Sequence, residues 1–140
     1  MTTTGTTTRP PRRLVRSALA VLGGLVAIVA LSMLADEIAY ATGLFPRPPK
    51  ITYDTGPYVV ATAYRAVIGV AGCWLAARLA PNHPMRHALI VGGIGVVMSA
   101  AGVFAAFTMD LGPVWYPIAL LVITPPAAWL GGTLYRGPKA

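Results

Sequence analysis

The chain has 140 residues, of which 56% are hydrophobic and only 11% are charged. An ordinary soluble domain carries about 25% charged residues, so this composition excludes that class and indicates one domain within a membrane. The net charge of +7 would suit nucleic acid, but the basic residues lie at the ends of apolar segments and form no stripe with aromatic residues. We therefore expect the lipid bilayer, and no nucleic acid, as the partner.

Residues 1–13 are rich in threonine and are interrupted by two prolines, which predicts a disordered segment. A basic cluster and a long uncharged apolar run follow, and they predict a membrane-spanning helix over about 14–38. A cleaved signal peptide is the alternative, because residues 39–41 read Ala-Tyr-Ala, which has the form of a cleavage site. The length of the run and the two acids before that site favour a retained helix.

The second predicted helix, over about 57–80, follows a loop dense in proline and glycine and carries Arg65 in its interior. A guanidinium inside a bilayer is costly unless a partner compensates its charge. At about 100° per residue, Arg65 shares a helix face with small residues such as Gly69 and Gly72, while bulky residues point the other way. Helices in lipid pack through small residues, so Arg65 should face the inside of a bundle.

The acids that end the first helix are the natural partners of Arg65. At about 1.5 Å per residue, Arg65 lies roughly 10 Å below the outer surface of the bilayer core, and its long stem can extend outward. A helical wheel places Glu37 closer than Asp36 to the small residues of the first helix, so Glu37 is the favoured partner and Asp36 the alternative. With Tyr64 added, this cluster predicts either a structural lock between two helices or a gate or anion site.

The third and fourth predicted helices cover about 85–107 and 114–135. Small residues recur every three or four positions in the third helix, which predicts a packing seam and the most central place in the bundle. Pro125 and Pro126 remove two backbone donors from the middle of the fourth helix and predict a kink. The predicted seam on the second and third helices consists of Gly69, Gly72, Gly92, Gly95, Ser99 and Gly102.

The turn between the second and third helices is basic, with Arg78, His83, Arg86 and His87. Two histidines four residues apart could bind a metal, but Pro84 lies between them and no third ligand is evident. We expect this turn to contact anionic lipid head groups, and we expect no metal. No motif of a hydrolase or of a nucleotide-binding enzyme occurs, so we expect no cofactor and no catalytic residue.

The basic residues also predict the orientation. Eight basic residues lie near the two chain ends or in the turn between the second and third helices, whereas two lie in the loop at 45–57. This excess places both termini in the cytoplasm. The predicted architecture is thus an all-α bundle of four transmembrane helices over 14–136, with a tail at 137–140. Similar sequence after Arg16 and after Arg86 suggests two helical hairpins in tandem.

Several short motifs resemble those of a group of small bacterial integral membrane proteins with four predicted helices. The resemblance covers about 14–136 and implies a multi-pass protein of the bacterial inner membrane; it carries over no catalytic residue, because the group has no assigned activity. The motifs are Tyr64-Arg65, Ala77-Arg78-Leu79-Ala80-Pro81, Pro84-Met85-Arg86-His87-Ala88-Leu89, Gly112-Pro113-x-Trp115-Tyr116-Pro117 and Trp129-Leu130-Gly131-Gly132.

These observations lead to two functional hypotheses. The first is a non-enzymatic structural or partner subunit, which self-associates through the seam of the third helix or binds another membrane protein. The alternative is a small transporter or channel that uses Arg65 and the acids on the outer side. Four helices alone enclose little room for a solute path, so this alternative requires an oligomer.

Overall fold

A computed structural model describes residues 11–137 of the chain. It contains four helices, α1 (Pro11–Ala41), α2 (Thr55–Leu79), α3 (Pro84–Thr108) and α4 (Trp115–Leu134), and no strand within those residues. All four helices are long and apolar enough to cross a membrane. The predicted all-α, four-helix membrane fold is therefore confirmed, whereas predictions for 1–10 and 138–140 fall outside the described residues.

The first helix is longer at both ends than predicted. It begins at Pro11, so the prediction of disorder is wrong for residues 11–13; proline suits the first helical position because that N–H has no partner within the helix anyway. At the other end, Gly43 adopts a left-handed φ of 78°. The Leu44 N–H then donates to the Ala39 carbonyl at 2.9 Å, which closes the helix only after Ala41.

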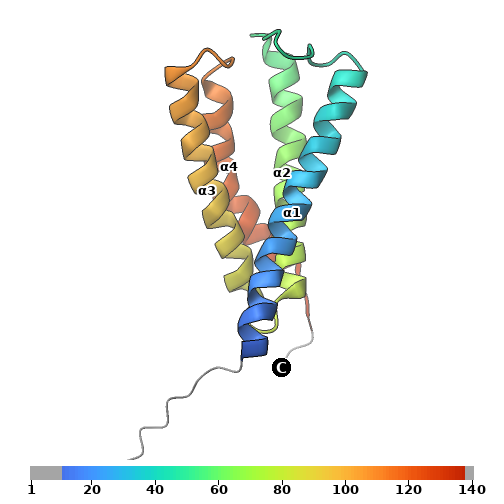
Figure 1. Cartoon of the computed structure of the whole chain (residues 1–140), viewed down its shortest axis with the longest axis vertical. Coiled ribbons are helices and arrows are strands. Elements are labelled where there is room, and N and C mark those ends of the chain that lie inside the picture. Colours follow the sequence, from blue (N-terminus) through green and yellow to red (C-terminus); the bar gives the residue numbers. More distant parts are fainter. Residues whose placement is uncertain (1–10, 138–140) are drawn as a thin grey trace, which may run out of the picture.

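The helices form two hairpins, α1–α2 and α3–α4, that meet at one end and separate at the other (Figure 1). We call the end with the 80–83 turn the closed end; it also holds the start of α1 and the finish of α4. We call the other end, with the loops 42–54 and 109–114, the open end. This arrangement matches the predicted tandem hairpins.

The core lies near the closed end and consists almost entirely of small side chains. Close helix packing in lipid favours such residues, because the backbones can then approach one another. The buried cluster contains Cys73, Ala76, Ala77, Ala88, Val91 and Ala128.

The most central helix is α2, not α3 as the seam predicted. Helix α2 packs against all three other helices, whereas α3 has few contacts with α1. The reason is that α2 has small residues on more than one face. A Cβ placed on Gly24 of α1 would lie 2.8 Å from the Gly72 carbonyl oxygen, and one on Gly131 of α4 would lie 2.7 Å from the Cys73 Cβ.

The proline pair of α4 lies at the border between the packed and the separated halves. Helix α4 continues through Pro125 and Pro126, and the Thr124 hydroxyl donates to the Leu120 carbonyl at 2.6 Å. The buried residues of this helix all follow the pair: Ala127, Ala128, Gly131 and Gly132. The predicted kink site is therefore where α4 joins the core.

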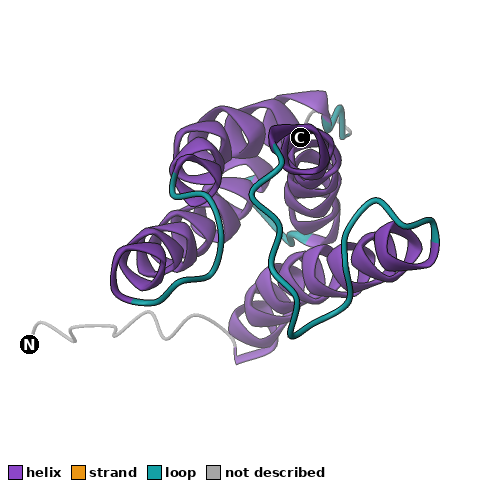
Figure 2. Ribbon diagram, turned by 90° about the horizontal axis from the view of Figure 1, so that it is seen from above, coloured by secondary structure: helices purple, strands orange, loops and turns teal. Residues whose placement is uncertain are grey.

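Loop contacts connect the two hairpins at the open end. The 42–54 loop extends across the top of the bundle toward the α3–α4 hairpin (Figure 2). The Tyr53 hydroxyl donates to the Asp110 carboxylate in the other loop. The Tyr58 ring packs edge-on against Phe45, at 5.1 Å between centroids, and lies 5.0 Å from the Tyr116 ring. The open end is thus covered by the loop and aromatic rings.

Candidate functional site

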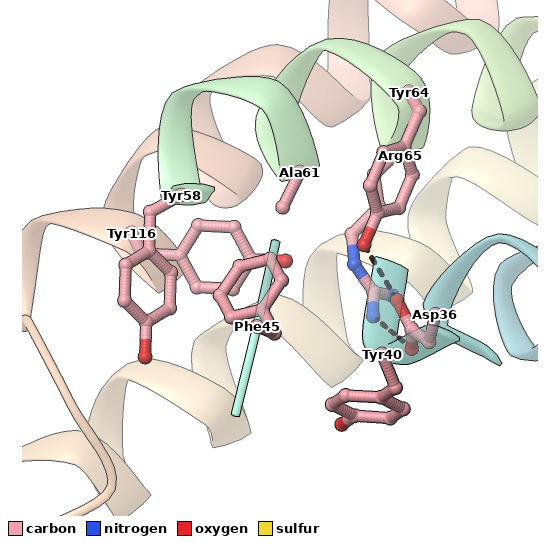
Figure 3. Close-up of a pocket in the computed structure, with 8 residues that line it drawn as sticks. All are labelled: Asp36, Tyr40, Phe45, Tyr58, Ala61, Tyr64, Arg65 and Tyr116. Atoms are coloured by element: carbon pink, nitrogen blue, oxygen red, sulfur yellow. Dashed lines mark hydrogen bonds and ion pairs between the residues drawn. The ribbon is translucent and has the colours of Figure 1, made fainter. Parts of the chain in front are cut away.

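The charged site lies where the two hairpins begin to separate. Arg65 Nη2 donates to Asp36 Oδ2 at 2.7 Å, and the Tyr64 hydroxyl donates to Asp36 Oδ1 at 2.6 Å (Figure 3). Arg65 and Tyr64 come from α2, and Asp36 comes from the last turns of α1. The prediction that Arg65 pairs with an acid of the first helix is confirmed.

The choice of Glu37 as the favoured partner is wrong. Glu37 lies 3.6 Å from Arg47, and both side chains are about two-thirds exposed, at 65%. A helical wheel treats the contact face as a stripe parallel to the helix axis. Packed helices instead contact along ridges of residues four apart, and these ridges run obliquely to the axis. The ridge of α1 that faces the bundle is Ala20, Gly24, Ile28, Ser32 and Asp36.

A cavity of about 170 Å³ adjoins the ion pair and is walled by aromatic rings (Figure 3). The Arg65 and Asp36 side chains both border it, and they remain 31% and 30% exposed. The cavity therefore presents charges of both signs beside aromatic faces. The remaining lining residues are Tyr40, Phe45, Tyr58, Ala61, Tyr64 and Tyr116.

Two further cavities also border Arg65. One, of about 410 Å³, lies toward the open end and is lined mainly by apolar residues of α3 and α4, with Tyr58, Ser99 and Tyr116 as further polar members. The other, of about 230 Å³, reaches deeper among all four helices and includes Ser32 and Thr124. Arg65 thus lies at the junction of three cavities.

Arg65 also has a donor that the protein leaves without an acceptor. Its Nε is shielded from solvent and has no hydrogen-bond partner within residues 11–137. A guanidinium has five N–H donors in a fixed plane, and buried donors are nearly always bonded. This geometry gives Arg65 hydrogen-bonding capacity beyond its bond to Asp36.

The predicted seam serves packing within the chain. A Cβ on Gly92 would clash with Ala128 Cβ, one on Gly95 would lie 3.0 Å from Thr124 Cγ2, and one on Gly102 would lie 3.7 Å from Pro117 Cβ. The seam of α3 therefore faces α4 within the chain, and its use for self-association stays a prediction.

The other seam residues have different surroundings. Gly72 meets Ile28 of α1, whereas a Cβ on Gly69 would make only ordinary contact with Ala127 Cβ, at 3.9 Å. Ser99 lines two of the cavities beside Arg65 instead of making a tight helix contact.

The basic turn lies at the closed end, far along the helices from the ion pair. Arg78, His83 and Arg86 are exposed as expected, but His87 is buried, at 5% exposure. Its Nδ1 lies 3.1 Å from the His83 carbonyl oxygen. The position one helical turn after His83 faces the core beside Ala88, so the prediction that placed His87 in the exposed turn is wrong.

Part of the basic turn borders a cavity of about 410 Å³ together with Arg13 of α1. Arg78 instead places its guanidinium over the Trp74 ring, 5.3 Å from the centroid. No group of three or more potential metal-ligating side chains occurs in the described part of the chain.

Sequence reasoning missed the aromatic wall of the site. Tyr40, Phe45 and Tyr58 lie at or beside helix ends flanking the proline-rich loop, where aromatic residues are ordinary interface anchors. Their convergence depends on how the loop folds back over the bundle. The available signal was their clustering on both sides of one loop.

No protein-family model, curated protein or solved structure matches the chain. The fold and the site nevertheless define its class. It is a multi-pass, α-helical membrane protein with a charged, aromatic-walled cavity near one end of the bundle.

Proposed function

We propose that the chain is a non-enzymatic subunit of the bacterial inner membrane, with both termini in the cytoplasm, whose open end receives a partner or ligand. The observation that carries this proposal is the contrast between the two ends. Tight glycine and alanine contacts hold the closed end, whereas three cavities meet at Arg65 toward the open end.

The proposed orientation and the assignment to the bacterial inner membrane are both inferred from the sequence. Basic residues are concentrated at the closed end and near the chain ends, as expected for the cytoplasmic side. The resemblance to small bacterial four-helix membrane proteins supports the same location.

The chemistry of the ion pair supports a holding role. Both carboxylate oxygens of Asp36 accept hydrogen bonds, from Arg65 and from Tyr64, so they connect α1 to α2. Charge-assisted bonds of this kind fix geometry. Such a site is suited to bind and orient a polar group at the open end.

Native mass spectrometry of the protein extracted from its own membrane in mild detergent tests the subunit role. We expect a defined complex with a second membrane protein or with further copies of the chain. The complex should weaken in Arg65→Gln and persist in Arg86→Gln, a matched arginine change at the closed end. A strict monomer, both in detergent and after crosslinking in the membrane, would contradict the proposal.

A small oligomeric transporter or channel is the second candidate. It is favoured by the deep cavity, which extends from Arg65 to Val91 and Gly92 beside the core near the closed end. Tight packing blocks the closed end within one copy, so a continuous path requires several copies. A strict monomer would exclude this candidate, and ion or solute flux in proteoliposomes that is lost in Arg65→Gln would support it.

A further inference from the structure

We infer that the cavity beside the Asp36–Arg65 ion pair binds a zwitterionic head group, an ammonium joined to an acidic group, carried by an amphiphile. This inference rests on the proposed function, because it names the ligand that the open end receives. Its basis is a single cavity lined by one carboxylate, one guanidinium and several aromatic rings.

The charge balance of the site selects a zwitterion. Asp36 and Arg65 together are neutral, so a ligand with a net charge would leave one charge uncompensated in a region largely removed from water, where unpaired charge is strongly disfavoured. The nearby Glu37 and Arg47 pair with each other, and both are exposed. Asp110 accepts the hydrogen bond from Tyr53. A zwitterion adds no net charge, and its ammonium can pair with Asp36 while its acidic group pairs with Arg65.

The ammonium end fits the aromatic side of the cavity. Asp36 remains 30% exposed, and the Tyr40, Phe45 and Tyr58 rings line the same space. The edge-to-face contact between Phe45 and Tyr58, at 81° between ring planes, gives this wall a defined geometry. Aromatic faces beside a carboxylate are a favourable environment for an ammonium group.

The acidic end fits Arg65 and the hydroxyl groups beside it. The guanidinium side chain is 31% exposed and borders the cavity, and only one of its five donors bonds to Asp36. Tyr116 lines the aromatic cavity and, with Ser99, the larger cavity on the other side of Arg65. Oxygen atoms of a phosphate or carboxylate accept hydrogen bonds from such donors.

The neighbouring cavities fit a hydrocarbon chain. Those of about 410 and 230 Å³ that adjoin Arg65 are lined mostly by apolar side chains, among them Met98 and Leu120 in both and Ile123 in the deeper one. Taken together, these volumes are in the usual range for ligand sites. A chain attached to the head group would occupy apolar space that a free zwitterion leaves unfilled.

Calorimetric titration of the purified full chain in nonionic detergent tests the ligand class. The probes are dihexanoyl phosphatidylethanolamine, the matched anionic phosphatidylglycerol, the cation hexyltrimethylammonium, and free phosphoethanolamine. We expect the zwitterionic lipid to bind about tenfold or more tightly than either charged probe, since each of these lacks one charged end. Equal affinities for all three amphiphiles would overturn the inference. Free phosphoethanolamine binding as tightly as the lipid would overturn the assignment to an amphiphile and retain the zwitterion site.

Variants connect the binding to the cavity. The double change Asp36→Asn with Arg65→Gln removes both charges with little change in side-chain volume, so it should abolish the preference for the zwitterion. Tyr40→Leu leaves the ion pair intact and should weaken binding about two- to thirtyfold through loss of a ring. The control, Arg86→Gln, changes an exposed charge at the closed end and should bind normally.

Unchanged binding by the double variant and by Tyr40→Leu would overturn the inference. A complex that persists in native mass spectrometry while no probe binds would separate this failure from a failure of the proposed function.

Discussion

A single arginine determines much of the chemistry of this protein. Its guanidinium lies in a membrane-spanning helix, where charge is costly, and it is stabilised by a carboxylate that a tyrosine also binds. The pair is about two-thirds buried by side-chain area, at 31% and 30% exposure. Its contribution to stability should therefore lie between that of a surface pair and that of a fully buried one.

Arg65→Ala should lower the melting temperature in detergent by leaving Asp36 without its counter-ion. We expect a loss of about 1–3 kcal/mol, reduced from the fully buried case because the two side chains remain 31% and 30% exposed. Adding Asp36→Ala should recover part of this loss. Arg47→Ala, which breaks the exposed pair, should change little, and a silent Arg65→Ala would exclude a structural role for the ion pair.

The contact between the two loops predicts a pH effect at the open end. The hydrogen bond to Asp110 raises the pKa of Tyr53 above its usual value of 10.0. Because the protonated phenol makes the bond, its stabilising effect is present below that usual pKa and is lost as the pH rises through the raised one. Ultraviolet titration in Asp110→Asn should show a phenol that ionises at lower pH than in the unchanged protein; the same titration curve in both would contradict this contact.

Helix α2 joins the two hairpins because its small residues face in several directions. Gly72 has no side chain and therefore lets α1 approach closely, and Cys73 lies against Gly131 of α4. The three helices thus pack closely near the closed end. At the same level α3 packs on α4 through Gly92. Small residues near the closed end thus set the angle at which the hairpins separate toward the open end.

Two adjacent glycines of α3 provide a direct test of this packing. Gly92→Ala should destabilise the protein by about 1–3 kcal/mol, because its new methyl group would collide with Ala128 of α4. Gly93→Ala meets nothing within 4 Å and should be neutral or slightly stabilising, as alanine is the better helix former. Thermal unfolding in detergent should rank the variants in that order; equal effects would contradict the α3–α4 contact.

In the whole molecule, the two hairpins pack tightly at the closed end, and a cavity lined by one acidic and one basic side chain lies toward the open end. In the proposed orientation the closed end lies toward the cytoplasm and the open end toward the outside. The 42–54 loop crosses the open end of the bundle (Figure 2), and its Phe45 lines the cavity. In this orientation, a ligand or partner that comes from the outside meets the 42–54 loop before it reaches Arg65.

Cysteine labelling in intact cells tests the orientation. In a Cys73→Ser background, a membrane-impermeant maleimide should label Lys50→Cys in the outer loop and should fail to label Asn82→Cys in the closed-end turn. Both positions are exposed, so access to the reagent depends on the side of the membrane. The opposite labelling pattern would reverse the proposed topology.

The sequence by itself determined the membrane class, the four helices and the contact of Arg65 with an acid of α1. The length of an apolar run, the helix-breaking residues and an isolated charge are local properties of the sequence. Bilayer thickness sets the helix length that such a run must reach, and an isolated charge inside the bilayer requires a partner. Only the tertiary structure decided that Asp36 is the partner, that α2 is central and that aromatic rings from several helices and a loop surround the pair. These features depend on helix crossing and loop path, which arise from contacts between distant residues.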